Sequence, residues 1–310
     1  MDIYTSVSQI ERLLHVPGSL VDEALKVESF YPFRCTSHYL NLVEYPSYRD
    51  PIFAQFFPSV KELEGRGFED PFGEENTTPH PHLIRRYGNR LLVLSTNVCF
   101  VHCRFCTRKR LWRESPFVFE DTDFLRSYLD SHPEIEDVLI SGGDPLTLPT
   151  DIIERILITV RSLPTVRVVR IGTRAPVVAP DTVYDKLRVL ERFAPLWINT
   201  HFNHPKEMTE ESKRAVMALI KAGCSVNNQT VLLRGVNDSY ETLRELFVGL
   251  LSMGVRPYYL FVCDPVVGAS HFSVPVRRAL QLVMRLRREA SGMAVPHLAV
   301  DGPYGKEIIP

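Results

Sequence analysis

The sequence predicts an α/β fold: six parallel strands in a partial (β/α)6 barrel, preceded by an N-terminal helical extension. From residue 90 onward, short runs rich in β-branched residues alternate with longer segments of helical period. These strand–helix units of roughly 30 residues each have the length of a βαβ repeat. Right-handed crossovers between such units produce a parallel sheet that curls into a barrel or partial barrel. A doubly wound open sheet is the alternative, because the hydrophobic period is the same in both.

The predicted elements divide the chain into three parts. Residues 1–80 hold the helical extension, with Val7, Ile10 and Leu14 at helical spacing, and most of a linker at 68–82 rich in Pro, Gly, Asn and acidic residues. Residues 81–290 form the barrel, and residues 291–310 form a C-terminal segment. The predicted strands are 90–96, 137–143, 166–172, 196–202, 225–233 and 257–263. The predicted helices include 121–132, 181–193, 210–223, 240–254 and 275–290.

Composition and charge exclude several classes of protein. The 310 residues are 45% hydrophobic and 24% charged, which is typical of a soluble globular protein. A formal net charge of −1 gives no electrostatic reason to bind nucleic acid. The chain start has no signal-peptide pattern, and its apolar runs are far shorter than the roughly 20 residues that a membrane helix needs. We therefore expect a cytoplasmic protein that binds neither nucleic acid nor a membrane.

Three of the six cysteines, Cys99, Cys103 and Cys106, lie within eight residues. The others are scattered, and we interpret them as small buried hydrophobic residues because a reducing cytosol does not maintain disulfides. Three clustered thiolates are typical of an iron–sulfur cluster. On a four-iron cluster they would bind three irons and leave the fourth open for another ligand. A zinc site completed by His102 or a distant histidine is the alternative.

Polar residues gather where the predicted strands end, which is where barrel enzymes carry their chemistry. Gly142 and Gly143 would let the backbone approach a ligand closely, and Asp144 could accept a hydrogen bond from an ammonium group or cap a helix. Asn228 and Gln229 could hydrogen-bond a cofactor or serve as buried structural amides. The strand ends carry the cysteine loop, Gly142, Gly143, Asp144, Arg174, Asn203, His204, Asn228, Gln229 and Asp264.

The segment CFVHCRFCTRKR has the CxxxCxxC spacing of the radical S-adenosylmethionine (SAM) enzymes, and its surroundings resemble the lysine 2,3-aminomutase family. The resemblance continues in collinear order over about two-thirds of the chain. It is carried by RRYGNR at 85–90, SGGDPL, RIGTRAPVV, NTHFNHP, NQTVLLRGVND, RPYYLFVCD and the terminal VDGPYGK.

The resemblance implies a partial barrel of the radical SAM type and three cofactors. Cys99, Cys103 and Cys106 would bind a [4Fe–4S] cluster whose open iron chelates S-adenosyl-L-methionine, with the Gly142-Gly143-Asp144 segment near its methionyl amino group. Lys306, in the C-terminal segment, would hold pyridoxal 5'-phosphate. Together these groups would move an amino group by radical chemistry, with the protein orienting and shielding the reaction.

The resemblance also implies roles for charged residues and for Gln229. Arg86 and Arg90 would hold the cofactor phosphate, for which guanidinium groups are suited, although both could be solvated surface charges. Arg108 would clamp the substrate carboxylate. Asp264 and Asp301 would neutralise the distal ammonium of the substrate, although Asp264 could be a turn residue. Gln229 would contact the adenosyl or pyridoxal group.

The implied activity is isomerisation of L-lysine to β-lysine, with an electron donor such as flavodoxin or ferredoxin as partner. Both a monomer and a homo-oligomer are compatible with the sequence. The chain stops soon after Lys306, which favours the short family form that supplies β-lysine for modification of elongation factor P. Another amino acid such as arginine is a further alternative. A zinc-containing binding protein is the alternative from a different class.

Overall fold

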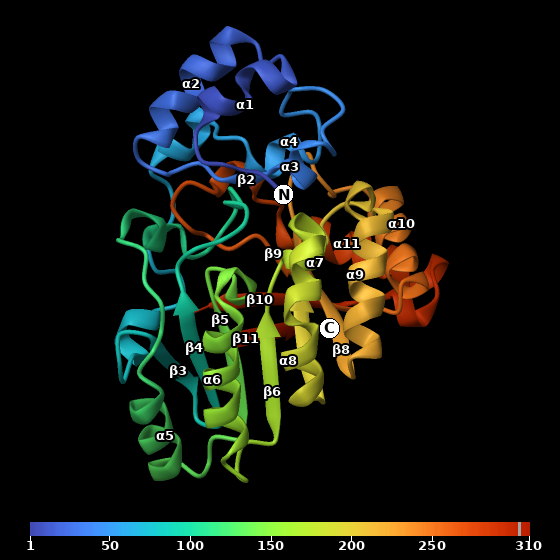
Figure 1. Ribbon diagram of the computed structural model, residues 1–310. Coiled ribbons are helices and arrows are strands. Elements are labelled where there is room, and N and C mark those ends of the chain that lie inside the picture. Colours follow the sequence, from blue (N-terminus) through green and yellow to red (C-terminus); the bar gives the residue numbers. More distant parts are fainter. Residues whose placement is uncertain (303–304) are drawn as a thin grey trace.

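Nine strands form one sheet in the computed structural model, which describes residues 1–302 and 305–310 (Figure 1). These strands are β3 (Leu83–Tyr87), β4 (Arg90–Thr96), β5 (Asp137–Gly142), β6 (Val168–Gly172), β7 (Leu196–Thr200), β8 (Cys224–Leu232), β9 (Arg256–Val262), β10 (His297–Gly302) and β11 (Gly305–Ile309). Their spatial order is β11-β10-β9-β8-β7-β6-β5-β4-β3, so chain neighbours are also neighbours in the sheet.

The six predicted strands are β4 to β9, and each pairs in parallel with the next. Parallel strands that pair in chain order, with a helix between each two, are typical of a (β/α) barrel. In a doubly wound sheet the strand order reverses at a switch point. The predicted α/β partial barrel is therefore confirmed. Three strands of this sheet were not predicted: β3 pairs antiparallel with β4, β10 runs parallel to β9, and β11 pairs antiparallel with β10.

Amphipathic helices lie outside the sheet. In α9 (Glu210–Lys221), Thr209 caps the N-terminus, and Ala215, Val216 and Leu219 form the buried face. The predicted helix 181–193 is divided into a 3-10 helix, η5 (Pro180–Lys186), followed by α8 (Leu187–Arg192). The remaining barrel helices are α5 (Thr122–Ser131), α6 (Thr150–Arg161), α7 (Ala175–Val178), α10 (Tyr240–Ser252) and α11 (Val276–Glu289). No helix of the described residues is long and apolar enough to cross a membrane.

The N-terminal residues lie against the end of the sheet toward which the β4 and β6 arrowheads point (Figure 1). Their helices bury aromatic residues: Phe53 stacks on Phe57 with ring centroids 4.2 Å apart. This part consists of β1 (Ile3–Tyr4), α1 (Val7–Leu14), α2 (Gly18–Glu28), β2 (Cys35–Thr36), α3 (Ser37–Leu40), α4 (Phe53–Phe56) and the 3-10 helix η1 (Val60–Glu64). The residues that come first in the chain thus cover the carboxyl ends of the strands.

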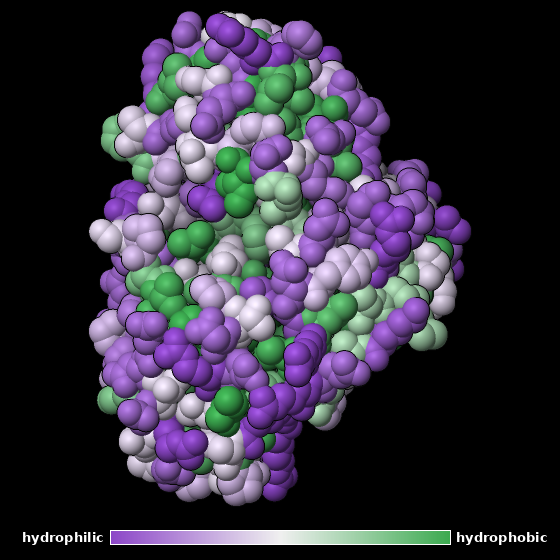
Figure 2. Space-filling view, in the orientation of Figure 1, coloured by the Kyte–Doolittle hydropathy of each residue, from purple (hydrophilic) through white to green (hydrophobic). Residues whose placement is uncertain are grey.

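The segment 68–82, expected to be a linker, packs against the barrel. The Phe68 N–H donates to the Pro265 carbonyl at 2.8 Å, and Phe72 is buried. Glu74, which begins the 3-10 helix η2 (Glu74–Thr77), is also buried. In the space-filling view, hydrophilic residues cover most of the visible face, and hydrophobic residues gather toward its middle, below the N-terminal helices (Figure 2).

Candidate active site

A cavity of about 350 Å³ lies inside the barrel and reaches the carboxyl ends of its strands. The thirteen residues to which the resemblance assigns a cofactor or the substrate all line this cavity. They are Arg86, Arg90, Cys99, Cys103, Cys106, Arg108, Gly142, Gly143, Asp144, Gln229, Asp264, Asp301 and Lys306. The Pro303-Tyr304 pair of the terminal motif lies outside the described residues. Residues more than 200 positions apart in sequence thus meet in one space.

The cysteine loop follows β4 and is held by the N-terminal residues. The Arg104 N–H donates to the Gln55 carbonyl at 2.8 Å, and the His102 N–H donates to the Arg34 carbonyl at 2.9 Å. The Arg104 guanidinium also forms an ion pair with buried Glu62 at 2.7 Å. Burial raises the pKa of Cys99 well above its usual value and that of Cys106 to about 11. Without a bound metal, these two thiols are therefore protonated at neutral pH.

His102, one of the two fourth ligands considered in the alternative zinc interpretation, has other partners. Its Nδ1 lies 2.8 Å from the Pro32 carbonyl, and its ring stacks on Trp112 with centroids 4.4 Å apart. Burial lowers the pKa of this histidine to about 3, so the ring is neutral. In residues 1–302 and 305–310, no three His, Cys, Asp or Glu side chains are arranged to hold one metal ion.

The two glycines after β5 allow close packing of backbone on backbone. A Cβ atom on Gly142 would meet the Thr96 carbonyl oxygen at 2.3 Å, and one on Gly143 would meet the Val98 carbonyl oxygen at 2.3 Å. Gly142 also has a φ of 123°, which favours glycine. The glycines therefore bring the end of β5 against the segment that leads into the cysteine loop.

Asp144 connects two strand ends. Its carboxylate accepts hydrogen bonds from Thr173 Oγ1 at 2.6 Å, from the Arg174 N–H at 2.8 Å and from the Leu146 N–H at 3.0 Å. The hydrogen bond from Leu146 caps a short 3-10 helix at Pro145–Thr147, so the alternative role of Asp144 as a helix cap is confirmed. Burial raises the pKa of this carboxyl. Asp144 fixes the loop after β5 to the loop after β6.

Arg108 is bound by a residue that the sequence analysis did not single out. Its Nη2 and Nε lie 2.5 and 3.1 Å from the two carboxylate oxygens of Glu74. Burial acts to raise the pKa of Glu74, but Arg108 and Arg110 outweigh it and hold the pKa at about 2. Glu74 was missed because it stands in a Pro-, Gly- and Asn-rich segment. Its burial depends on long-range pairing with arginines, which no local pattern reveals.

Lys306 and Asp301 face each other across the β10–β11 hairpin, where they form a register pair. The Lys306 ammonium lies over two aromatic rings, 4.0 Å from the centroid of Tyr259 and 4.6 Å from that of Phe261. Burial lowers the pKa of Lys306 to about 8, although Asp301 opposes the shift. A lysine with such a pKa is a better nucleophile at neutral pH than a solvated one.

Two acidic residues and two arginines complete this end of the cavity. Asp264 is a short distance past β9, and burial, together with Asp301, raises its pKa to about 8. The Asp301 carboxylate pairs with Arg86 Nη2 at 2.9 Å. Arg90 is exposed at the start of β4, with its guanidinium 4.6 Å from the Tyr87 ring centroid.

The two amides of β8 have different environments. Gln229 lines the cavity, whereas Asn228 is fully buried. Asn228 Oδ1 accepts a hydrogen bond from the Phe202 N–H at 2.7 Å, and its Nδ2 donates one to the Phe202 carbonyl at 3.0 Å. Asn228 is therefore a buried structural amide, which was the alternative interpretation of this residue. Arg174, which the sequence placed at a strand end without a role, lies in the cavity wall next to Cys103.

Comparisons with known proteins agree with this site. The model of the Radical SAM superfamily matches residues 93–247. An L-lysine 2,3-aminomutase of Fusobacterium nucleatum is 40% identical over 97% of this chain and 72% of its own length. An L-lysine 2,3-aminomutase of Clostridium subterminale is 41% identical over 87% of this chain and 66% of its own length.

Two further comparisons concern the substrate and the fold. A glutamate 2,3-aminomutase of Clostridioides difficile is 36% identical over 97% of this chain and 72% of its own length. Among solved structures, a radical SAM methyltransferase from Sphaerobacter thermophilus covers 71% of this chain and 68% of its own, with a TM-score of 0.50 and 16% sequence identity. The structural similarity concerns the fold alone.

Proposed function

The chain belongs to the lysine 2,3-aminomutase family of radical SAM enzymes, and we propose that it interconverts L-α-lysine and β-lysine. The observation that supports lysine most strongly is the pair of acidic residues, Asp264 and Asp301, in the cavity that also holds the three cysteines and Lys306. An acidic pair favours a substrate with a cationic side chain.

The family uses a [4Fe–4S] cluster, SAM and pyridoxal phosphate, which together supply the radical chemistry of amino migration. We assign the cluster to Cys99, Cys103 and Cys106. The donor set fits, since the three thiols are free, line one cavity and stand on one loop. The reaction also needs a one-electron donor, for which we propose a flavodoxin or ferredoxin.

Pyridoxal phosphate fits the other end of the cavity. Lys306 is partly buried, and its pKa of about 8 leaves a substantial neutral fraction of the amine that would attack the aldehyde. Arg86 and Arg90 lie on β3 and β4, beside the hairpin that carries Lys306, and would bind the phosphate. For Arg86 this requires exchange of its present partner, Asp301, for the phosphate.

The substrate would lie between these two ends. Arg108 would bind its carboxylate, with Glu74 orienting the guanidinium. Asp264 and Asp301 would receive its side-chain ammonium. The buried ring of Tyr259 packs against the Lys306 ammonium at this end of the cavity.

Glutamate is the second candidate because a glutamate 2,3-aminomutase is among the relatives. Asp301 argues against it, since its carboxylate would repel that of the substrate, and neither Asp264 nor Asp301 supplies a positive charge to bind a carboxylate. Arginine would satisfy the same two acids, so charge alone does not separate it from lysine.

Anaerobic turnover of L-lysine, L-arginine and L-glutamate, followed by product identification, tests the proposal. We expect β-lysine from lysine and no isomerisation of glutamate, and the arginine reaction shows whether the site also accepts a larger cationic side chain. The chirality of that β-lysine distinguishes two forms of the enzyme: the short form that supplies β-lysine for modification of elongation factor P, and the form that makes β-lysine as a free metabolite. Turnover of glutamate with none of lysine would contradict the proposal.

A further inference from the structure

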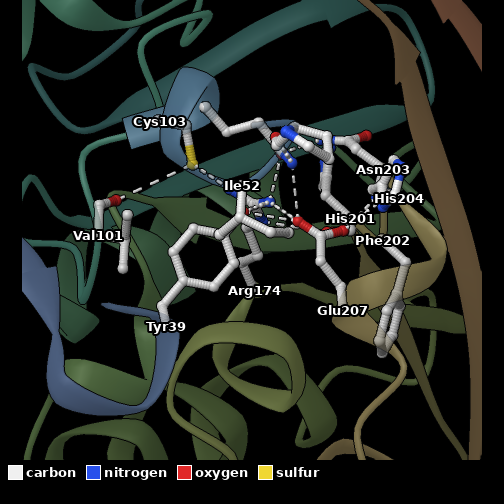
Figure 3. Close-up of polar contacts among 12 residues, drawn as sticks. Tyr39, Ile52, Val101, Cys103, Arg174, His201, Phe202, Asn203, His204 and Glu207 are labelled. Atoms are coloured by element: carbon white, nitrogen blue, oxygen red, sulfur yellow. Dashed lines mark hydrogen bonds and ion pairs between the residues drawn. The ribbon is translucent and has the colours of Figure 1, made fainter. Parts of the chain in front are cut away.

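We propose that Arg174 is a positioning residue for the iron–sulfur cluster: it hydrogen-bonds the sulfur of Cys103 and makes the cluster easier to reduce. Arg174 Nη1 lies 2.8 Å from Cys103 Sγ (Figure 3). The inference rests on the proposed function in one respect, namely that Cys103 is a cluster ligand.

The rest of the Arg174 guanidinium is fixed by residues from three separate parts of the chain. Nε donates to the His201 carbonyl at 3.0 Å. Nη2 donates to Tyr39 Oη at 3.0 Å, to Gln55 Oε1 at 2.7 Å and to Glu207 Oε1 at 2.6 Å. With Nε and Nη2 held by these partners, the guanidinium is oriented so that Nη1 points at the sulfur, as the close-up view shows (Figure 3).

The anchors of Arg174 are themselves held. Glu207 is fully buried, and it accepts hydrogen bonds from Tyr39 Oη at 2.6 Å and Gln55 Nε2 at 3.0 Å, and from the Asn203 and His204 N–H groups at 2.5 and 3.0 Å. These donors hold the carboxylate in place, and the carboxylate in turn holds the arginine. The Arg174 N–H is bound in turn by Asp144, at 2.8 Å.

The position of Arg174 has an electrostatic consequence for a cluster bound through Cys103. Reduction adds one negative charge to the cluster and its thiolate ligands. A cationic N–H donor at one sulfur stabilises that added charge, so the midpoint potential rises. The effect is strong here because Arg174, Tyr39, Gln55 and Glu207 are all buried from solvent.

A purely structural role is the competing explanation, since Arg174 also joins the N-terminal residues to the loops after β6 and β7. A structural arginine would affect folding and iron loading but not the potential of the cluster that is loaded. The midpoint potential, measured without SAM or substrate, therefore separates the two explanations.

The experiment is an EPR-monitored redox titration of the full chain, reconstituted anaerobically with iron and sulfide. Two variants remove or shorten the donor: Arg174→Lys, and the double variant Arg174→Met with Glu207→Gln, which avoids leaving a buried carboxylate unpaired. Tyr39→Phe is the matched control, because it removes one anchor of Arg174 and leaves the contact with sulfur.

We expect both Arg174 variants to lower the midpoint potential by an amount equal to at least a tenfold change in the reduction equilibrium, about 59 mV for one electron. Tyr39→Phe should keep the wild-type potential. Wild-type potentials in iron-loaded Arg174 variants would overturn the inference. So would failure of both Arg174 variants to load iron while Tyr39→Phe loads it, since the arginine would then act on assembly. Absence of a cluster in the wild-type chain would instead contradict the proposed function.

Discussion

The Arg86 guanidinium lies 2.9 Å from the Asp301 carboxylate and joins β3 to β10, which lie near opposite ends of the strand order. A second contact joins the same two ends, because the Lys306 N–H donates to Tyr87 Oη at 2.8 Å. These two contacts close the open side of the partial barrel. They also bring Lys306 into the cavity at whose other end the cysteines lie.

The lowered pKa of Lys306 predicts how pyridoxal phosphate binding depends on pH. Burial disfavours the ammonium form, so the reactive neutral amine forms as pH rises through about 8. We expect the rate at which the absorbance of lysine-bound pyridoxal phosphate appears to rise through that pH. Asp301→Asn removes the carboxylate that stabilises the ammonium and should move the profile to lower pH. An unchanged absorbance in Lys306→Met would show that another lysine binds the cofactor.

The raised pKa of Asp264 predicts proton release on substrate binding. Below pH 8 this buried carboxyl is protonated in the empty site, and a substrate ammonium beside it would lower its pKa. Calorimetry at pH 7 in buffers of different ionisation enthalpy should therefore show more proton release with L-lysine than with L-norleucine, which lacks the ammonium. The difference should vanish in Asp264→Asn. If it persists there, Asp264 does not bind the side chain.

The buried ion pairs beneath the cysteine loop predict a large effect on stability. Glu62 pairs with Arg104 at 2.7 Å and Lys109 at 2.6 Å, and all three side chains are at most 1% exposed. Glu62→Gln leaves two buried cations without their counter-ion and should lower the free energy of unfolding by about 3–5 kcal/mol. Urea denaturation measures this.

An exposed pair serves as the control for that variant. Arg285 and Glu289 lie 3.1 Å apart, with side chains 43% and 46% exposed. Glu289→Gln should cost less than about 1 kcal/mol. Equal losses in Glu62→Gln and Glu289→Gln would show that the buried pairs do not hold the loop.

Gly143 predicts a steric link between β5 and the cysteine loop. A Cβ atom there would lie 2.3 Å from the Val98 carbonyl oxygen, so Gly143→Ala must displace the segment just before Cys99. We expect a loss of about 1–3 kcal/mol in stability and less iron bound per chain after reconstitution. Gly292→Ala, where a Cβ would meet nothing within 4 Å, should bind iron like the wild type. Full iron loading in Gly143→Ala would contradict the link.

The sequence predicted the six central strands well because each is a buried β-branched run between helices, which is a local signal. The β10–β11 hairpin was missed, since its five paired positions at the chain end lack the length and period of a strand–helix unit. The single predicted helix over 181–193 begins as a 3-10 helix at Pro180. Elements whose stability comes from long-range pairing left no local pattern.

The same distinction applies to the site. The cysteine spacing and the collinear motifs identified thirteen cavity residues, because these residues belong to recognisable short patterns. Glu74 and the partners of Arg174 were not identified. Tyr39, Gln55 and Glu207 come from distant parts of the chain and meet only in the folded protein, where burial makes their hydrogen bonds strong. Sequence analysis found the residues that would bind cofactors, but not those that hold them in place.

Mössbauer spectroscopy of the anaerobically reconstituted chain, before and after addition of SAM, tests most directly whether three thiols leave one iron open. We expect four irons per chain, one of which changes its spectrum when SAM binds while the other three do not. Four equivalent irons that do not respond to SAM, or a single tetrahedral zinc ion held by protein side chains, would contradict the account.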